Sequence, residues 1–345
     1  MSETTRAQLK GLAGLAVILA CWTVYAVYFS PTQGWTFYLQ LTVNGIILGS
    51  VYALIALGYT MVYGILKLLN FAHGDVFMVG AFIAFGVLTL LGGAYNPAIP
   101  AGAGGALIVL CMFAAAMLGS GVLGVTIERF AYRPLRNAPR IAPLISALGV
   151  AFFLENSMLL LFGSGFRTYN GFDLISYNGI HLGGANGVFI QYLGLMVIVS
   201  SVALMVALIA LVRWTQLGRA MRAVSFDREA SAMMGIDIDR VIAATFFIGS
   251  ALAGAAGVMF GLLYSQVYHL MGFFAGLKGF TAAVVGGIGS IPGAMLGGLL
   301  VGLVESWAQG YLNGNVADLV VFGILIAVML IRPRGLFGTP ELQKV

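Results

Sequence analysis

Long apolar runs separated by short polar stretches dominate the pattern of residues along the chain. Eight simple runs can be read near 11–29, 41–64, 71–92, 102–126, 142–162, 192–213, 241–265 and 317–331. A membrane-spanning helix needs about 20 mostly apolar residues, so each run predicts a span. A longer run at 279–309 is interrupted by GGIGSIPG at 286–293. Because glycines followed by a proline divide a helix, this run predicts two short spans or one re-entrant pair.

The composition supports this interpretation. Of the 345 residues, 60% are hydrophobic and only 8% are charged. We therefore predict an all-α fold, a polytopic helical membrane bundle of about 8–10 spans that includes a broken or re-entrant glycine-rich segment. We expect three regions: an N-terminal segment with an extra span at 1–40, a main membrane domain at 41–335, and a cytoplasmic tail at 336–345.

The basic residues give an expected orientation in the membrane. If Arg6 and Lys10 are cytoplasmic, alternate loops become cytoplasmic and contain most of the other basic residues. These loops lie at Lys67, at 129–140 and at 213–240. An even number of crossings through the run 279–309 then makes the C-terminus cytoplasmic. Of the 17 basic residues, only Arg167 and Lys278 would lie outside.

The segment 213–240 is the longest charged stretch, and it predicts a structured surface at the membrane boundary. A short helix over 226–234 is expected, with Ser225 as its N-cap and Gly235 as its C-terminal stop. Its apolar residues Phe226, Ala230, Met233 and Met234 fall on one helical face. Such a face can insert into a groove of a partner or pack on the chain's own membrane helices. The pattern leaves both possibilities open.

The sequence lacks the chemistry of an enzyme. None of its lysines stands in a G-x-x-x-x-G-K-[ST] loop, so any role driven by ATP requires a separate ATPase. The G-x-G-x-x-G match at 119–124 lies inside an apolar run and indicates close helix packing. The histidines lack metal-ligand spacing, and no pairing of a nucleophile with a base is evident. We therefore expect no catalytic residue, no metal and no cofactor in this chain.

Polar residues at or near membrane depth are candidates for a translocation pathway. Ionisable groups are costly in lipid, so Glu155 and Glu305 are expected to face a polar interior. The alternative is that each one locks two helices through a hydrogen bond. Asn70 can instead cap the third span, with Asp75 in its first turn. The full candidate set is Asn44, Tyr52, Asn70, His73, Asp75, Glu155, Asn156 and Glu305.

Several blocks of sequence resemble one family of transporters. NGIILGSVYALIALGYTMVYG at 44–64 is followed by NFAHGD at 70–75, IERFAYRP at 127–134 and FTAAVVGGIGSIPGA at 280–294. Gly218-Arg219-Ala220 and Met234-Gly235-Ile236 also match in order. Together these blocks are similar to the LivH-type permease of bacterial branched-chain amino acid ABC importers. The resemblance extends over about residues 40 to 345, so 41–335 is expected to be an ABC importer permease domain.

The resemblance implies a multi-pass subunit of the bacterial inner membrane with several protein partners. These are a second homologous permease, two cytoplasmic ATPases that bind ATP, and a periplasmic substrate-binding protein. No nucleic acid is involved. Such importers often carry a Glu-Ala-Ala-x3-Gly motif on the loop that contacts the ATPase, and Glu229, Ala230 and Gly235 match it in part. The expected ATPase-coupling residues are Arg219, Arg222, Phe226, Glu229, Ala230, Met233, Met234 and Gly235.

The function that we predict is therefore that of a permease subunit moving branched-chain, hydrophobic amino acids from a periplasmic binding protein into the cytoplasm by alternating access. Two alternatives remain at this point. An ion-coupled secondary transporter would be expected to use intramembrane acids and inverted repeats, and no clear repeat is evident. A passive channel for a small polar solute is the other alternative.

Overall fold

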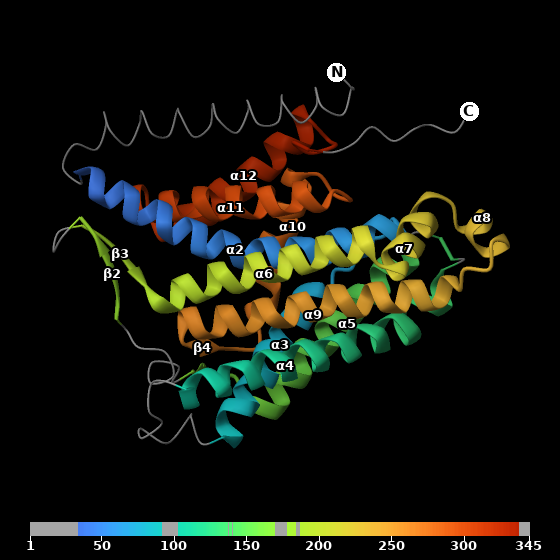
Figure 1. Cartoon of the computed structure of the whole chain (residues 1–345), viewed down its shortest axis with the longest axis horizontal. Helices are drawn as coiled ribbons and strands as arrows, with labels where there is room; N and C mark the ends of the chain where they lie inside the picture. The colour runs from blue at the N-terminus through green and yellow to red at the C-terminus, as the bar shows by residue number, and fades with distance from the viewer. Residues whose placement is uncertain are drawn as a thin grey trace.

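The computed structural model describes residues 34–91, 103–136, 138–139, 141–169, 178–183 and 187–337. Within them, eight helical segments are long and apolar enough to cross a membrane, which confirms the polytopic all-α prediction (Figure 1). The long helices are α2 (Gly34–Leu66), α3 (His73–Leu90), α4 (Ala103–Ile127), α5 (Ile141–Phe162), α6 (Tyr192–Trp214), α9 (Ile238–Tyr264), α11 (Ile291–Tyr311) and α12 (Gly314–Ile331). The shorter ones are η1 (Glu128–Tyr132), η2 (Arg133–Leu135), α7 (Gln216–Phe226), α8 (Arg228–Met233) and α10 (Met271–Gly286). The extra span predicted at 11–29 lies outside the described residues.

Short strands mark one end of the bundle, and α7 and α8 mark the other (Figure 1). The strands are β1 (Arg167–Thr168), β2 (Gly179–Leu182), β3 (Val188–Gln191) and β4 (Gln266–Val267). β1 pairs with β4, and β2 pairs with β3, both antiparallel. We refer below to the strand end and the α7–α8 end. β1, β2 and β3 lie between the apolar runs predicted at 142–162 and 192–213.

Glycines allow the central helices to approach closely. A methyl group at Gly49 on α2 would come within 2.8 Å of the Leu299 backbone on α11, a distance that Cβ atoms essentially never adopt. On α4, Gly121 and Gly124 face Phe247 and Ser250 of α9 in the same way. The glycine motif at 119–124 is therefore a helix-packing motif, as predicted, because a larger side chain would separate the two helices.

The break in the glycine-rich run lies between α10 and α11. Gly287 and Gly289 have φ of +109° and +93°, which favour glycine. The Ser290 side chain then caps α11 by accepting a hydrogen bond from Gly293 N at 3.2 Å, and a proline lies in the first turn. The predicted break is thus confirmed. It separates a helix of 16 residues, α10, from a full-length span, α11.

Three predicted boundaries differ in the structure. α2 begins at Gly34, so the boundary between 40 and 41 falls within a continuous helix. The tail at 336–345 begins inside the fold, because Leu336 N and Phe337 N donate to the carbonyls of Val285 and Gly286 at 2.8 and 3.0 Å. Lys278, which the apolar pattern assigns to an outer loop, lies in α10, since this helix already begins at Met271.

Candidate functional site

The predicted coupling segment 213–240 forms two short helices, α7 and α8, where one helix over 226–234 was expected. Asp227 separates them and caps α8, because its Oδ1 accepts a hydrogen bond from Ala230 N at 3.1 Å. The assignment of Ser225 as the N-cap is therefore wrong. Ser225 lies in the last turn of α7, where its hydroxyl donates to Arg222 O at 2.8 Å. The Asp227 carboxylate caps α8 better than a serine hydroxyl would, because its negative charge also interacts favourably with the dipole of the helix.

The end of α8 follows the prediction. Gly235 has φ +80°, and the next amide, Ile236 N, donates back to Ser231 O at 3.1 Å. This bond closes a Schellman-type turn, which needs a residue in the left-handed region and so favours glycine. The stop fixes the direction in which Met233 and Met234 leave the helix.

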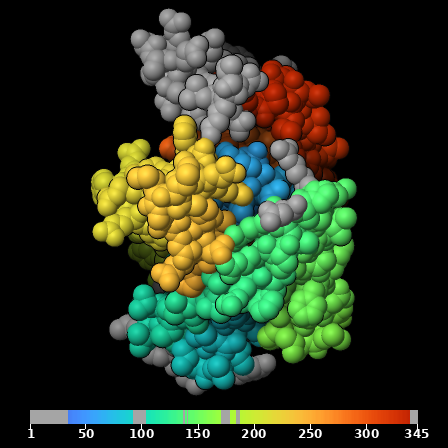
Figure 2. All heavy atoms as spheres, turned by 90° about the vertical axis from the view of Figure 1, so that its right-hand side faces the viewer, coloured from blue at the N-terminus to red at the C-terminus, as the bar shows by residue number. Residues whose placement is uncertain are grey.

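The apolar face of α8 points away from the rest of the described chain. Met233 and Met234 have exposed fractions of 83% and 82%, and Ala230 is also exposed. Phe226, predicted on the same helix, is instead the last residue of α7 and is 76% exposed. Ser231 is buried on the opposite side. Met233 and Met234 therefore do not pack on the membrane helices that the structure describes, which was one of the two alternatives left by the sequence. Figure 2 views the molecule from this end, and the yellow and orange atoms of 213–240 are exposed at the surface.

The two short helices are attached firmly to the bundle behind them. Arg228 Nη2 donates to Ile65 O, near the end of α2, at 2.8 Å. Met221 and Val224 of α7 are buried in the main apolar core. Burial lowers the pKa of Arg228, and the nearby positive charge of Arg136 lowers it further. α8 is therefore bonded directly to α2, the helix at the centre of the bundle.

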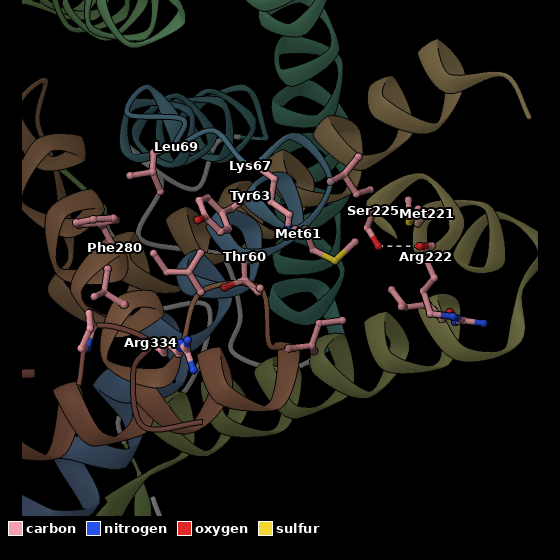
Figure 3. Close-up of a pocket in the computed structure, with 18 of the residues that line it drawn as sticks. Thr60, Met61, Tyr63, Lys67, Leu69, Met221, Arg222, Ser225, Phe280 and Arg334 are labelled. Carbon is pink, nitrogen blue, oxygen red and sulfur yellow. Dashed lines mark hydrogen bonds between the residues drawn. The ribbon is translucent and has the colours of Figure 1, made fainter. Parts of the chain in front are cut away.

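A cavity of about 660 Å³ lies beside α7 (Figure 3). Its lining includes three basic residues, Lys67, Arg222 and Arg334, and no acidic residue. Residues from α2, α7, α10 and the segment after α12 meet here. Arg334 thus lies at the same end of the bundle as Lys67. Of the other coupling candidates, Arg219 and Glu229 are exposed at this end.

Asn70 and His73 lie deeper than the predicted junction between two spans. The His73 ring is fully buried, with its centroid 4.7 Å from that of Tyr59. Tyr59 precedes the end of α2 at Leu66 by two turns, or about 10 Å along the helix. The chain therefore turns back into the bundle before α3 begins. Asn70 does not cap α3, because its Oδ1 accepts a hydrogen bond from the Tyr132 hydroxyl at 2.9 Å.

Asp75 and Glu155 line one small cavity, of about 70 Å³. Asp75 lies in the first turn of α3, as predicted, and Glu155 comes from the middle of α5. Their exposed fractions are 3% and 8%. Asp75 Oδ1 has no hydrogen-bond partner among the described residues. The other lining residues are Tyr59, Phe71, Leu148, Ala151, Phe152, Gly272, Phe273, Gly276, Leu277 and Phe280.

Glu305 belongs to a separate cluster nearer the strand end. Lys278 Nζ lies 2.7 Å from Glu305 Oε1 and 2.7 Å from Asp318 Oδ1, so one lysine joins α10, α11 and α12. Glu305 Oε1 also accepts a hydrogen bond from Gln309 Nε2 at 3.1 Å, and Tyr52 lies beside this carboxylate. Sequence reasoning missed Lys278 and Asp318. The signal available was a lone lysine just before the glycine-rich run, with one acid near the end of the run and another shortly after it.

The structure therefore divides the eight pathway candidates. Asp75 meets Glu155, and Tyr52 meets Glu305. Asn156 is exposed and donates to its own helix at Phe152 O, at 2.7 Å. Asn44 is exposed near β3 and accepts a hydrogen bond from Gln40 at 3.1 Å. Among the described residues, no three His, Cys, Asp or Glu side chains gather in a way that could hold a metal ion.

Comparison with known proteins gives a consistent result along nearly the whole chain. The family model for the permease component of branched-chain amino acid transport systems matches residues 41–329. The high-affinity branched-chain amino acid transport system permease protein BraD of Pseudomonas aeruginosa is 45% identical over 89% of this chain and 98% of its own length. LivH of Escherichia coli K12, which has the same description, is 42% identical over 91% of this chain and 100% of its own. A probable LivH of Methanocaldococcus jannaschii is 28% identical over 86% of this chain and 91% of its own.

Proposed function

This chain belongs to the family of permease components of branched-chain amino acid transport systems, and from that premise we propose that it is the membrane-spanning subunit of an ATP-driven importer. Its substrates are branched-chain, hydrophobic amino acids, which it receives from a periplasmic binding protein and releases into the cytoplasm. The names of the BraD and LivH relatives support this substrate class. The family match also favours this function over an ion-coupled transporter or a passive channel.

The α7–α8 end is proposed to face the cytoplasm of a bacterium, with the protein in the inner membrane. The basic residues of the described chain support this orientation, because Lys67, Arg136, Arg222 and Arg334 all lie at this end. Positively charged loops are typical of the cytoplasmic side. The C-terminus, which follows Arg334, is then cytoplasmic as well.

The observation that carries the proposal is the exposed apolar face of α8. In our proposal it inserts into a groove of a cytoplasmic ATPase, and a second homologous permease with a second ATPase completes the transporter. Two exposed methionines at the end of α8, together with the exposed Phe226 at the end of α7, provide an adaptable hydrophobic surface for such a contact. ATP is bound by the ATPase subunits, and this chain itself uses no cofactor.

Coupling follows from how α8 is held. Its Asp227 cap and the Gly235 turn make it a rigid unit, and Arg228 ties it to the carbonyl of Ile65. Movement of the ATPases would therefore shift the end of α2 and the walls of the neighbouring 660 Å³ cavity. In this way hydrolysis outside the membrane would change access to the pathway within it.

The test is ATP-dependent uptake of radiolabelled leucine by proteoliposomes that contain the complete complex and its binding protein. The double substitution Met233→Ser, Met234→Ser should reduce uptake and stimulated ATPase activity about tenfold or more, as loss of a hydrophobic hot spot does. Arg240→Ala is the matched control, because Arg240 is exposed at the same end but off the apolar face. Leucine uptake without the ATPases, or a double variant with normal coupling, would overturn the proposal.

A further inference from the structure

From the small cavity between α3, α5 and α10, we infer that Asp75 and Glu155 form a subsite for a primary ammonium group, that of the amino acid in transit. The inference rests on the proposed function for the identity of the substrate. Its chemistry comes from the cavity itself, which contains two carboxylates and is walled mainly by apolar and aromatic side chains.

Asp75 lies where two helices begin. It is in the first turn of α3, and a methyl group built on Gly272, in the first turn of α10, would come within 2.6 Å of Asp75 Oδ1. The N-terminus of a helix carries a partial positive charge, so both helices favour the ionised form of this carboxylate. Even so, Asp75 Oδ1 has no hydrogen-bond partner among the described residues.

The cavity lacks a basic residue to balance its acids. Glu155 faces it from α5 and lies close enough to repel Asp75, and no lysine or arginine is among the lining residues. Other titratable groups close to the two acids are Tyr59, which lines the cavity and lies within electrostatic reach of Asp75, and His269, which lies within electrostatic reach of Glu155. His73 packs on Tyr59. Buried acids inside a membrane are normally paired. We expect the missing positive charge to be supplied by the ligand.

The walls and the size of the cavity suit one end of a hydrophobic amino acid. A water-sized group needs about 10–15 Å³, so 70 Å³ holds about five to seven such groups, enough for an ammonium group and the carbons next to it but not for a whole leucine. Tyr59 and Phe280 line the interior and offer cation–π contacts. Phe152 and Phe273, with exposed fractions of 61% and 57%, lie at the mouth, where a branched side chain would rest.

The same features favour brief binding. Among the described residues, no lysine or arginine lines the cavity to hold the carboxylate of the substrate, so only one end of the zwitterion is bound. A small inorganic cation such as Na⁺ has chemistry in common with an ammonium group. The experiment must therefore distinguish a substrate ammonium from a free ion.

Photo-leucine, a leucine analogue that cross-links on illumination, is the probe. The complete complex in membrane vesicles is illuminated with millimolar photo-leucine, and labelled residues are mapped by mass spectrometry. Labels are expected on Phe152 and Phe273. Asp75→Asn and Glu155→Gln should each reduce this labelling about tenfold, the effect of losing one charge-assisted hydrogen bond, whereas Asp75→Glu should retain it. Ser157→Ala is the matched control on α5, since Ser157 bonds only to its own helix at Phe153 O.

Each result decides the question. Labelling at the mouth that depends on both acids supports the subsite. Labelling that is unchanged in Asp75→Asn and Glu155→Gln overturns it, and so does leucine uptake that requires Na⁺ and loses this requirement in either variant. Because labelling is measured without the binding protein and without turnover, a wild-type complex that fails to import leucine would refute the proposed function separately. If Asp75→Asn does not assemble, Glu155→Gln decides alone, because Glu155 makes no hydrogen bond to another described residue that the substitution would break.

Discussion

Two groups of buried acids lie within the same bundle, and the protein treats them in opposite ways. Glu305 is 1% exposed and shares Lys278 with Asp318, so its charge is compensated by a neighbour from another helix. Asp75 is equally buried but lines a cavity with a second acid and has no basic partner there. The comparison separates two roles that a sequence cannot distinguish, because an ion pair that joins helices stabilises structure, whereas an uncompensated charge remains available to a ligand.

The largest effect is expected when the compensated group loses its cation. Lys278→Met removes the partner of Glu305 and leaves a buried charge, so unfolding in mixed micelles should become easier by about 3–5 kcal/mol. Lys67→Met, which changes an exposed lysine at the other end, should cost less than about 0.5 kcal/mol. Restoration of stability by a second substitution, Glu305→Gln, would identify the buried charge as the cause. If Lys278→Met and Lys67→Met were equally stable, the cluster around Lys278 would have no structural role.

A smaller effect is expected from filling the space beside Asp75. Gly272→Ala places a methyl group 2.6 Å from Asp75 Oδ1 and 2.8 Å from the Gly74 carbonyl, so α3 and α10 must separate slightly. Overpacking of this kind costs about 1–3 kcal/mol, measured by the same unfolding method. Photo-leucine labelling at the cavity should fall as well. Gly323→Ala is the control, because a methyl group there meets nothing within 4 Å.

The outer member of the ion-pair cluster should matter less than its buried partner. Asp318 is 44% exposed at its side chain, so Asp318→Asn should cost no more than about 1 kcal/mol, and the effect should shrink further at high salt. Unfolding measured at low and high ionic strength tests this. If Asp318→Asn lowered the stability as much as Lys278→Met does, the three side chains would act as one unit, and the exposure of each one would not determine its contribution.

The smallest effect on stability is expected at Asp75. Asp75→Asn gives up the attraction of two helix N-termini but also removes an uncompensated buried charge, so the net change should lie within about 1 kcal/mol of zero. Leucine uptake should nevertheless fall strongly. A variant that keeps its stability but loses transport would separate the role of Asp75 from that of Glu305. If Asp75→Asn instead lowered the free energy of unfolding by several kcal/mol, Asp75 would be a structural residue like Glu305.

Patterns along the sequence determined the class of this protein and much of its outline. Apolar runs of about 20 residues have few structural solutions in a membrane, so the spans, the break before α11 and the charged segment at 213–240 could be predicted from local composition. The Gly235 stop was predictable for the same reason, because a helix end depends on residues a few positions away. The exposure of Met233 and Met234 could not be predicted, because the sequence shows which side of a helix is apolar but not what covers that side.

Only the tertiary structure decided how the polar residues at membrane depth are paired. Asn70 meets Tyr132, Asp75 meets Glu155, and Lys278 meets Glu305 across separations of 62, 80 and 27 positions. Such contacts depend on which helices pack together and at what height, and hydropathy carries no information on either. The return of the chain after α2 brings His73 and Asp75 into the bundle, and the early start of α10 brings Lys278 inside it. The identity of the acids was written in the sequence, but packing decided which one received a counter-charge.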